Sequence, residues 1–138
     1  MRMQRIQNIC AKLVLNRRKF DSSKQALYDL HWLPVKTRIQ FKLLSFMYNC
    51  SVGCAPVYLT ELLSPQVPNR SGLRSSNYTE GCYAVPFNKR KTFSDRGFST
   101  VDPLLWNTLP LDIKQSESSD VFKRKLKTLY FRDFYSLF

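Results

Sequence analysis

The sequence is poor in the residue types that build most catalytic sites. It has one histidine, His31, and its four glycines, at positions 53, 72, 81 and 97, are isolated from one another. A single histidine argues against a histidine-based triad or a two-histidine metal site, and isolated glycines argue against a phosphate-binding loop. No two of the ten acidic residues are adjacent, so the clustered carboxylates that hold metal ions for nucleotidyl transfer are missing. We therefore expect no catalysis by this chain alone, and no cofactor.

Long apolar runs are also scarce, and the four cysteines form no complete set of metal ligands. Cys50 and Cys54 have a spacing compatible with part of a metal site, but further ligands are lacking, so we expect no metal. Cys10 is predicted to be a small core residue on an apolar helical face. No apolar run approaches the ~20 residues of a membrane span, and the basic N-terminus lacks the pattern of a signal peptide. We expect a cytoplasmic or nuclear protein that is not secreted and has no membrane partner.

Positive charge dominates what is present. The chain has 138 residues, of which 22 are Lys or Arg and ten are acidic, for a net charge of +12. Residues 1–20 contain six basic residues and no acidic one. A field of this sign attracts polyanions, and we favour a nucleic acid, RNA or DNA, over an anionic membrane as the partner.

Three basic clusters lie beside aromatic residues or on an expected helix. Single-stranded nucleic acids are bound by cations that hold phosphates and by rings that stack on bases. Each cluster alone has an ordinary alternative as a solvated surface, whereas the three together favour a phosphate-binding surface. The predicted nucleic-acid-binding residues are Arg17, Arg18, Lys19, Lys89, Arg90, Lys91, Lys123, Arg124, Lys125 and Lys127.

The apolar spacing predicts a mainly α fold of five or six short helices. A helix over residues 3–16 is expected to bury one stripe: Ile6, Ile9, Cys10, Leu13 and Val14. A short capped helix follows, and residues 30–35 are expected to form a tight junction with Trp32 and Leu33 largely buried. A third helix opens at Pro34, and its expected core stripe is Val35, Ile39, Leu43, Phe46 and Met47.

The composition changes along the chain and suggests three parts. Residues 1–63 are predicted to form a basic helical subdomain, residues 64–81 a loop rich in Pro, Ser and Asn, and residues 82–138 a mixed segment. The mixed segment allows a small β-hairpin near residues 82–93, followed by short helical turns that Pro103 and Pro110 interrupt. It ends in a basic amphipathic helix that Ser118 or Ser119 caps.

A series of short stretches, in this order and at these spacings, resembles the C-terminal region of the polyprotein of LINE-type (non-LTR, jockey-like) retrotransposons. The resemblance covers nearly the whole chain. The stretches are residues 5–8, 11–14, 30–35, 38–42, 55–59, 73–76, 95–99, 105–110 and 122–127.

The resemblance implies that the chain belongs at the end of a reverse transcriptase. The family's catalytic motif, an aromatic residue, any residue and two aspartates, lies upstream and is absent here, so no catalytic residue is carried over. The family region follows the polymerase thumb, is thought to contact template RNA or target DNA, and supplies no zinc ligands at Cys50 or Cys54. We thus expect a non-catalytic, nucleic-acid-contacting segment, the remnant of a truncated element copy, whose second partner is the missing upstream polymerase core. The alternatives are a structural extension that packs on that core, or a reading frame with no selected function.

Overall fold

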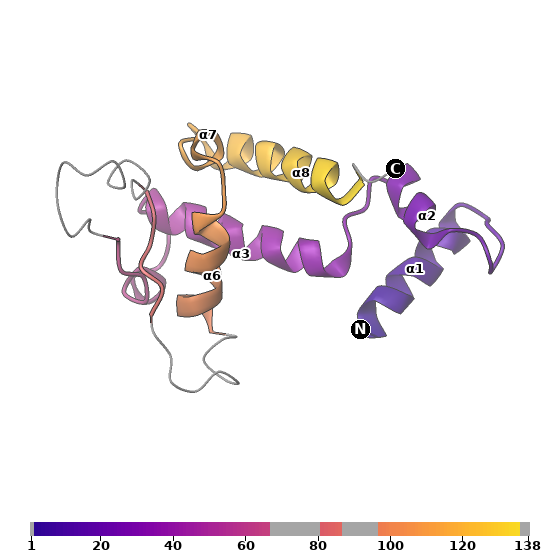
Figure 1. The fold of residues 1–138 in the computed structure, drawn as a ribbon, viewed down its shortest axis with the longest axis horizontal. Helices are drawn as coiled ribbons and strands as arrows, with labels where there is room; N and C mark the ends of the chain where they lie inside the picture. The colour runs from indigo at the N-terminus through magenta and orange to yellow at the C-terminus, as the bar shows by residue number, and fades with distance from the viewer. Residues whose placement is uncertain (1, 67–80, 87–96, 136–138) are drawn as a thin grey trace. The chain divides into compact units, whose positions relative to one another are not determined.

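The protein is mainly α-helical. A computed structural model describes residues 2–66, 81–86 and 97–135, which contain seven helices and no strand (Figure 1). The predicted fold class is confirmed. Of the expected hairpin, residues 82–86 form no strand, Tyr83 makes an isolated antiparallel bridge with Pro65, and residues 87–93 lie outside the described residues.

The chain forms two compact units. The first contains residues 1–41 and 124–138, and the second contains residues 42–123. The predicted division at the loop of residues 64–81 stays a prediction, because most of that loop lies outside the described residues.

The first unit is built on the pairing of α1 (Arg2–Val14) with α2 (Ser23–Asp29). The Ser22 hydroxyl caps α2 by accepting a hydrogen bond from the Gln25 amide at 3.3 Å. Ala11 and Ala26 are fully buried, and side chains this small let two helix backbones approach closely. Residues from α3 (Val35–Ser51) and α8 (Ser119–Tyr135) complete this unit. Its core contains Ala11, Ala26, Leu27 and Tyr135, with Leu15, Leu30, Trp32, Phe131 and Phe134 packed against it.

The inward side of α1 is polar, contrary to the predicted stripe. Gln7 is buried and its Nε2 donates to the Leu33 carbonyl oxygen at 2.9 Å, while Gln4 Oε1 accepts from the Val35 amide at 2.9 Å. These amides satisfy backbone groups at the start of α3, which apolar side chains could not do. All five residues of the predicted stripe are therefore exposed, including Cys10, and the prediction that they form the core is wrong.

Replacing Gln7 by leucine is expected to lower the free energy of unfolding by about 1–3 kcal/mol. Leucine nearly matches the volume of glutamine, but it leaves the buried Leu33 carbonyl without its donor. Urea unfolding followed by circular dichroism measures the change. Gln115→Leu, at an exposed position, is the matched control; equal midpoints for the two variants would contradict the buried hydrogen bond.

The junction of residues 30–35 is as tight as predicted. His31 takes a positive φ of 53°, and the Trp32 amide donates to the Leu27 carbonyl at 2.9 Å. Leu33 is buried, as expected, whereas Trp32 is half-buried. The Trp32 carbonyl accepts a hydrogen bond from the Tyr135 hydroxyl at 2.8 Å, which ties the junction to α8.

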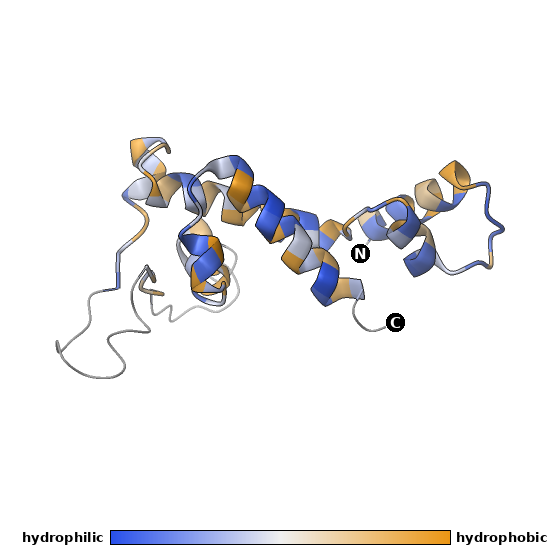
Figure 2. Cartoon of the chain, turned by 90° about the horizontal axis from the view of Figure 1, so that it is seen from above, coloured by the Kyte–Doolittle hydropathy of each residue, from blue (hydrophilic) through white to orange (hydrophobic). Residues whose placement is uncertain are grey.

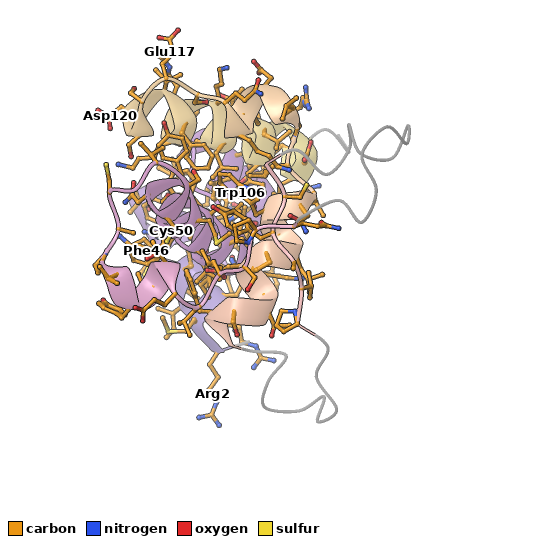
Figure 3. All side chains as sticks on the ribbon, turned by 90° about the vertical axis from the view of Figure 1, so that its left-hand side faces the viewer. Arg2, Phe46, Cys50, Trp106, Glu117 and Asp120 are labelled. Atoms are coloured by element: carbon orange, nitrogen blue, oxygen red, sulfur yellow. The ribbon has the colours of Figure 1, made fainter. Side chains whose placement is uncertain are left out.

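The second unit is organised around Trp106. This residue lies on α6 (Phe98–Asn107), is almost completely buried, and donates from Nε1 to the Gly81 carbonyl at 2.8 Å. Its ring centroid lies 5.9 Å from that of Phe122, which stacks on Tyr48 at 4.5 Å. Figure 3 shows Trp106 and Cys50 inside this unit, with Glu117 and Asp120 directed outward.

Two short helices, α4 (Val57–Thr60) and α7 (Leu111–Lys114), complete the second unit. Pro103 lies inside α6 and does not interrupt it, so that expectation is wrong. Of the predicted α3 stripe, Met47 is buried, but Ile39 and Phe46 are exposed. The Tyr48 hydroxyl instead faces inward and donates to the Ser116 carbonyl at 2.7 Å, so the buried side of α3 is turned from the predicted one.

Candidate nucleic-acid interface

The predicted basic residues fall in two described places. Arg17, Arg18 and Lys19 lie between α1 and α2, and four others lie on α8. The third predicted cluster, Lys89, Arg90 and Lys91, lies outside the described residues.

The cations that follow α1 differ in whether an acidic side chain pairs with them and in how exposed they are. Arg17 forms an ion pair with Asp29, whose other carboxylate oxygen accepts from Gln25 Nε2 at 3.0 Å. Arg17 is thus already paired with an acidic side chain within the fold. Arg18 and Lys19 are exposed, and the backbone amide of Arg18 donates to the Asp21 carboxylate at 2.7 Å, which shapes the turn.

Phe20 follows these two cations and is 93% exposed. The Lys19 Nζ lies 5.9 Å from its ring centroid. An exposed ring next to a solvated cation offers a stacking face with a phosphate-binding group beside it, which is the arrangement that single strands use. We call Arg18, Lys19 and Phe20 the basic–aromatic turn.

A cavity of about 260 Å³ lies between α1 and this turn. Its apolar lining comes from Ile9 and Leu13, and its cationic lining from Lys12, Arg17 and Lys19. Lys12 Nζ donates to the Lys19 carbonyl at 2.8 Å, so Lys12 holds the turn in place. The fold therefore brings Arg17 and Lys19 together with a cation that the sequence did not single out as a binding residue.

On α8, three of the four predicted cations share one side. At about 100° per residue, Lys123, Arg124 and Lys127 lie within an arc of roughly 100°, and all three are exposed. Asp120 lies 3.7 Å from Lys123, but both side chains are well exposed, so this pair neutralises little charge. Lys125 projects elsewhere and is half-buried. We call Lys123, Arg124 and Lys127 the basic face of α8.

The second unit buries two titratable side chains, Asp102 and Cys50, which are separate from the exposed basic residues. Asp102 on α6 is fully buried, and neither carboxylate oxygen has a hydrogen-bond partner. Burial raises the pKa of Asp102 to about 7. Burial, and then the nearby Asp102 carboxylate, raise the pKa of the Cys50 thiol. A buried thiol of raised pKa is a poor nucleophile, so this pair lacks the features of an activated catalytic centre.

Metal ligands are not gathered anywhere in the described part of the chain: no three His, Cys, Asp or Glu side chains there could hold an ion together. None of the helices in residues 2–66, 81–86 and 97–135 combines the length and apolar character that a membrane crossing needs. Sequence reasoning missed Asp102, because a lone aspartate before a proline gives no signal of burial.

Comparison with protein-family models, with curated proteins and with solved structures finds no match to this chain.

Proposed function

We propose that this chain is a non-catalytic segment that contacts single-stranded nucleic acid, at the C-terminal end of a retrotransposon reverse transcriptase of the LINE type that it resembles. The observation that supports binding best is the basic–aromatic turn, where two exposed cations precede a ring that is 93% exposed and Lys19 Nζ lies 5.9 Å from the centroid of that ring. Leaving such a ring in water has an energetic cost, which stacking on a base offsets.

The basic face of α8 supplies a second set of phosphate contacts. It has three exposed cations on one helical side and one weakly paired acid. No exposed ring adjoins these cations in the sequence, so this face supplies charge without stacking. We assign the positioning of the backbone to α8 and the contact with bases to Phe20.

A second candidate function, packing on a reverse-transcriptase core, is favoured by a different observation. The predicted core stripe of α1 is exposed and apolar, and such stripes on folded proteins commonly mark contact surfaces.

Binding of a fluorescent oligothymidylate is expected to weaken steeply with salt. Each phosphate contact on a single strand contributes about −0.7 to the log–log slope, so five contacts give about −3.5. Changing Lys123, Arg124 and Lys127 to glutamine should make that slope shallower by up to about 2. Phe20→Ala should weaken binding about tenfold while the slope stays the same, because a stacked ring releases no counterions. Anisotropy titrations at several salt concentrations measure both effects.

Tyr58→Ala is the matched control, since this exposed ring on α4 has no adjacent cation in the sequence. A shallow slope in the parent chain that the triple variant does not alter would overturn the nucleic-acid proposal. Equal losses from Phe20→Ala and Tyr58→Ala would exclude base stacking at the turn.

A further inference from the structure

The outward side of α1 carries an apolar stripe that no described residue of the first unit covers. Ile6 is 59% exposed and Leu13 is 73% exposed, although both are large aliphatic residues. The hydrophobic positions of this helix, next to the N-terminus, can be followed in Figure 2. At about 100° per residue they span an arc of roughly 140°. We define the outer face of α1 as Met3, Ile6, Ile9, Cys10, Leu13 and Val14.

The spacing within this face is that of a helix–helix seam. Met3, Ile6, Cys10 and Leu13 follow one another at intervals of three, four and three residues. Side chains at alternating intervals of three and four face a second helix lying alongside, because they stay on one line along a slightly underwound helix. The inner side of α1 is already occupied by the first unit, through Gln4, Gln7 and Ala11. Within the first unit the seam is therefore open to another helix.

The charge beside the seam indicates the chemistry of that helix. Arg2 and Arg5 are exposed along one edge of the outer face, and residues 1–20 contain no acid. A second copy of this chain would bring the same cations together and be repelled by its own net charge of +12. A helix with glutamate or aspartate beside its apolar stripe would complement both the seam and its basic edge.

A lipid surface fits this face less well than a helix does. Helices that lie in a bilayer interface carry their cations around the polar side, whereas these cations follow one edge only and the opposite edge is packed into the first unit. The cavity of about 260 Å³ beside Ile9 and Leu13 is also a feature that a flat bilayer would leave unfilled. An acidic side chain reaching into it from a neighbouring helix would meet Lys19, which is one of its lining residues.

We propose that the outer face of α1 binds an acidic amphipathic helix of a partner protein, with Met3, Ile6, Cys10 and Leu13 in the seam and Arg2 and Arg5 paired with its acids. This binding does not require nucleic-acid binding by the basic face of α8 or by Phe20, which use other residues. It would give the second candidate function a defined contact surface.

The probe is a synthetic helical peptide with leucines at seam positions and glutamates beside them. The full chain is expected to bind it in an anisotropy titration. The double change Ile6→Gln with Leu13→Gln should weaken binding at least about tenfold, since it removes two central apolar contacts. The matched control, Val57→Gln with Tyr58→Gln, alters two equally exposed residues on α4 and should bind as the parent does. Circular dichroism of each variant checks that the helices remain folded.

Charge reversal tests the assigned edge. The double change Arg2→Glu with Arg5→Glu should lose affinity for the glutamate peptide and gain affinity for a peptide with lysines in place of the glutamates. That exchange of preference cannot come from unfolding, because an unfolded variant would lose both. Oligothymidylate binding by the Ile6→Gln, Leu13→Gln chain should stay at the parent level, which separates this face from the nucleic-acid interface.

Three outcomes would overturn the proposal. The first is failure of the parent chain to bind the glutamate peptide. The second is binding to phosphatidylserine vesicles that Ile6→Gln with Leu13→Gln abolishes, since this assigns the face to lipid. The third is a dimer of the parent chain in sedimentation velocity that the same double change dissociates, since this assigns the face to a second copy.

Discussion

Replacing Trp106 by alanine is expected to lower the free energy of unfolding by about 3–5 kcal/mol. The side chain is 2% exposed, its ring contacts those of Tyr83 and Phe122, and its Nε1 donates to the Gly81 carbonyl. Alanine would leave a cavity at the centre of the second unit and an unpaired carbonyl at its edge. Since small domains are stable by only about 5–15 kcal/mol, this one change removes a large part of the total.

Urea unfolding followed by circular dichroism measures the effect, and the remaining Trp32 fluorescence reports on the first unit in the same samples. Trp106→Phe separates the two contributions, because it keeps an aromatic ring and loses only the indole donor along with some volume. We expect a loss of about 1–3 kcal/mol from that variant. Alanine and phenylalanine variants with the parent's midpoint would show that Trp106 is not central to the core.

Replacing Asp102 by asparagine is expected to remove a large loss of stability between pH 4 and pH 7. Burial raises the pKa of Asp102 from 3.8 to about 7, so the folded protein holds this proton where the unfolded chain releases it. The carboxyl therefore contributes stability in full below about pH 4, and that contribution declines as the pH rises and is gone above about pH 7. A shift of about three pKa units corresponds to about 4 kcal/mol.

The asparagine variant stays neutral at every pH, so its stability should decline less than the parent's. At pH 8 the difference should favour the variant by up to about 4 kcal/mol relative to the difference at pH 4. Urea midpoints at a series of pH values measure both. Glu117→Gln, at an exposed carboxyl directed outward in Figure 3, should leave the pH profile of stability unchanged. Parallel profiles for the parent and Asp102→Asn would mean that the carboxylate finds a partner in the folded state.

The helices could be predicted because their ends carry local signals. A capped second helix is predicted and Ser22 supplies the cap of α2, and α3 begins directly after Pro34. The facing of α1 could not be predicted, because periodicity identifies an apolar side without saying what covers it. Hydrogen bonds of Gln4 and Gln7 turn these two residues inward, and their backbone partners lie 31 and 26 residues away, respectively. The prediction that Pro103 interrupts the helix was wrong for a related reason. Buried neighbours hold α6 together, although proline has no backbone N–H to donate.

The sequence could predict which basic residues form the candidate interface, but not which of them are paired or exposed in the fold. The basic clusters can be read from the sequence, and the exposed positions of Arg18, Lys19 and the three cations of the α8 face agree with a surface role. The pairing of Arg17 with Asp29 depends on the α1–α2 packing and gives no sequence signal. The sequence set Phe20 beside a basic cluster and left core packing of its ring as the alternative, and the structure places this ring at the surface.

The first unit is built from residues near both ends of the chain, so its two parts are synthesised at different times during translation. The Tyr135 hydroxyl reaches the Trp32 carbonyl across 103 residues, and Phe131 and Phe134 pack on the core that α1 and α2 begin. A ribosome therefore releases α1 and α2 long before the residues that cover Leu27 exist. The second unit, continuous from residue 42 to residue 123, has all its residues earlier. Nascent chains at this stage expose α2's apolar side, and a chaperone that binds short hydrophobic segments would find its target there.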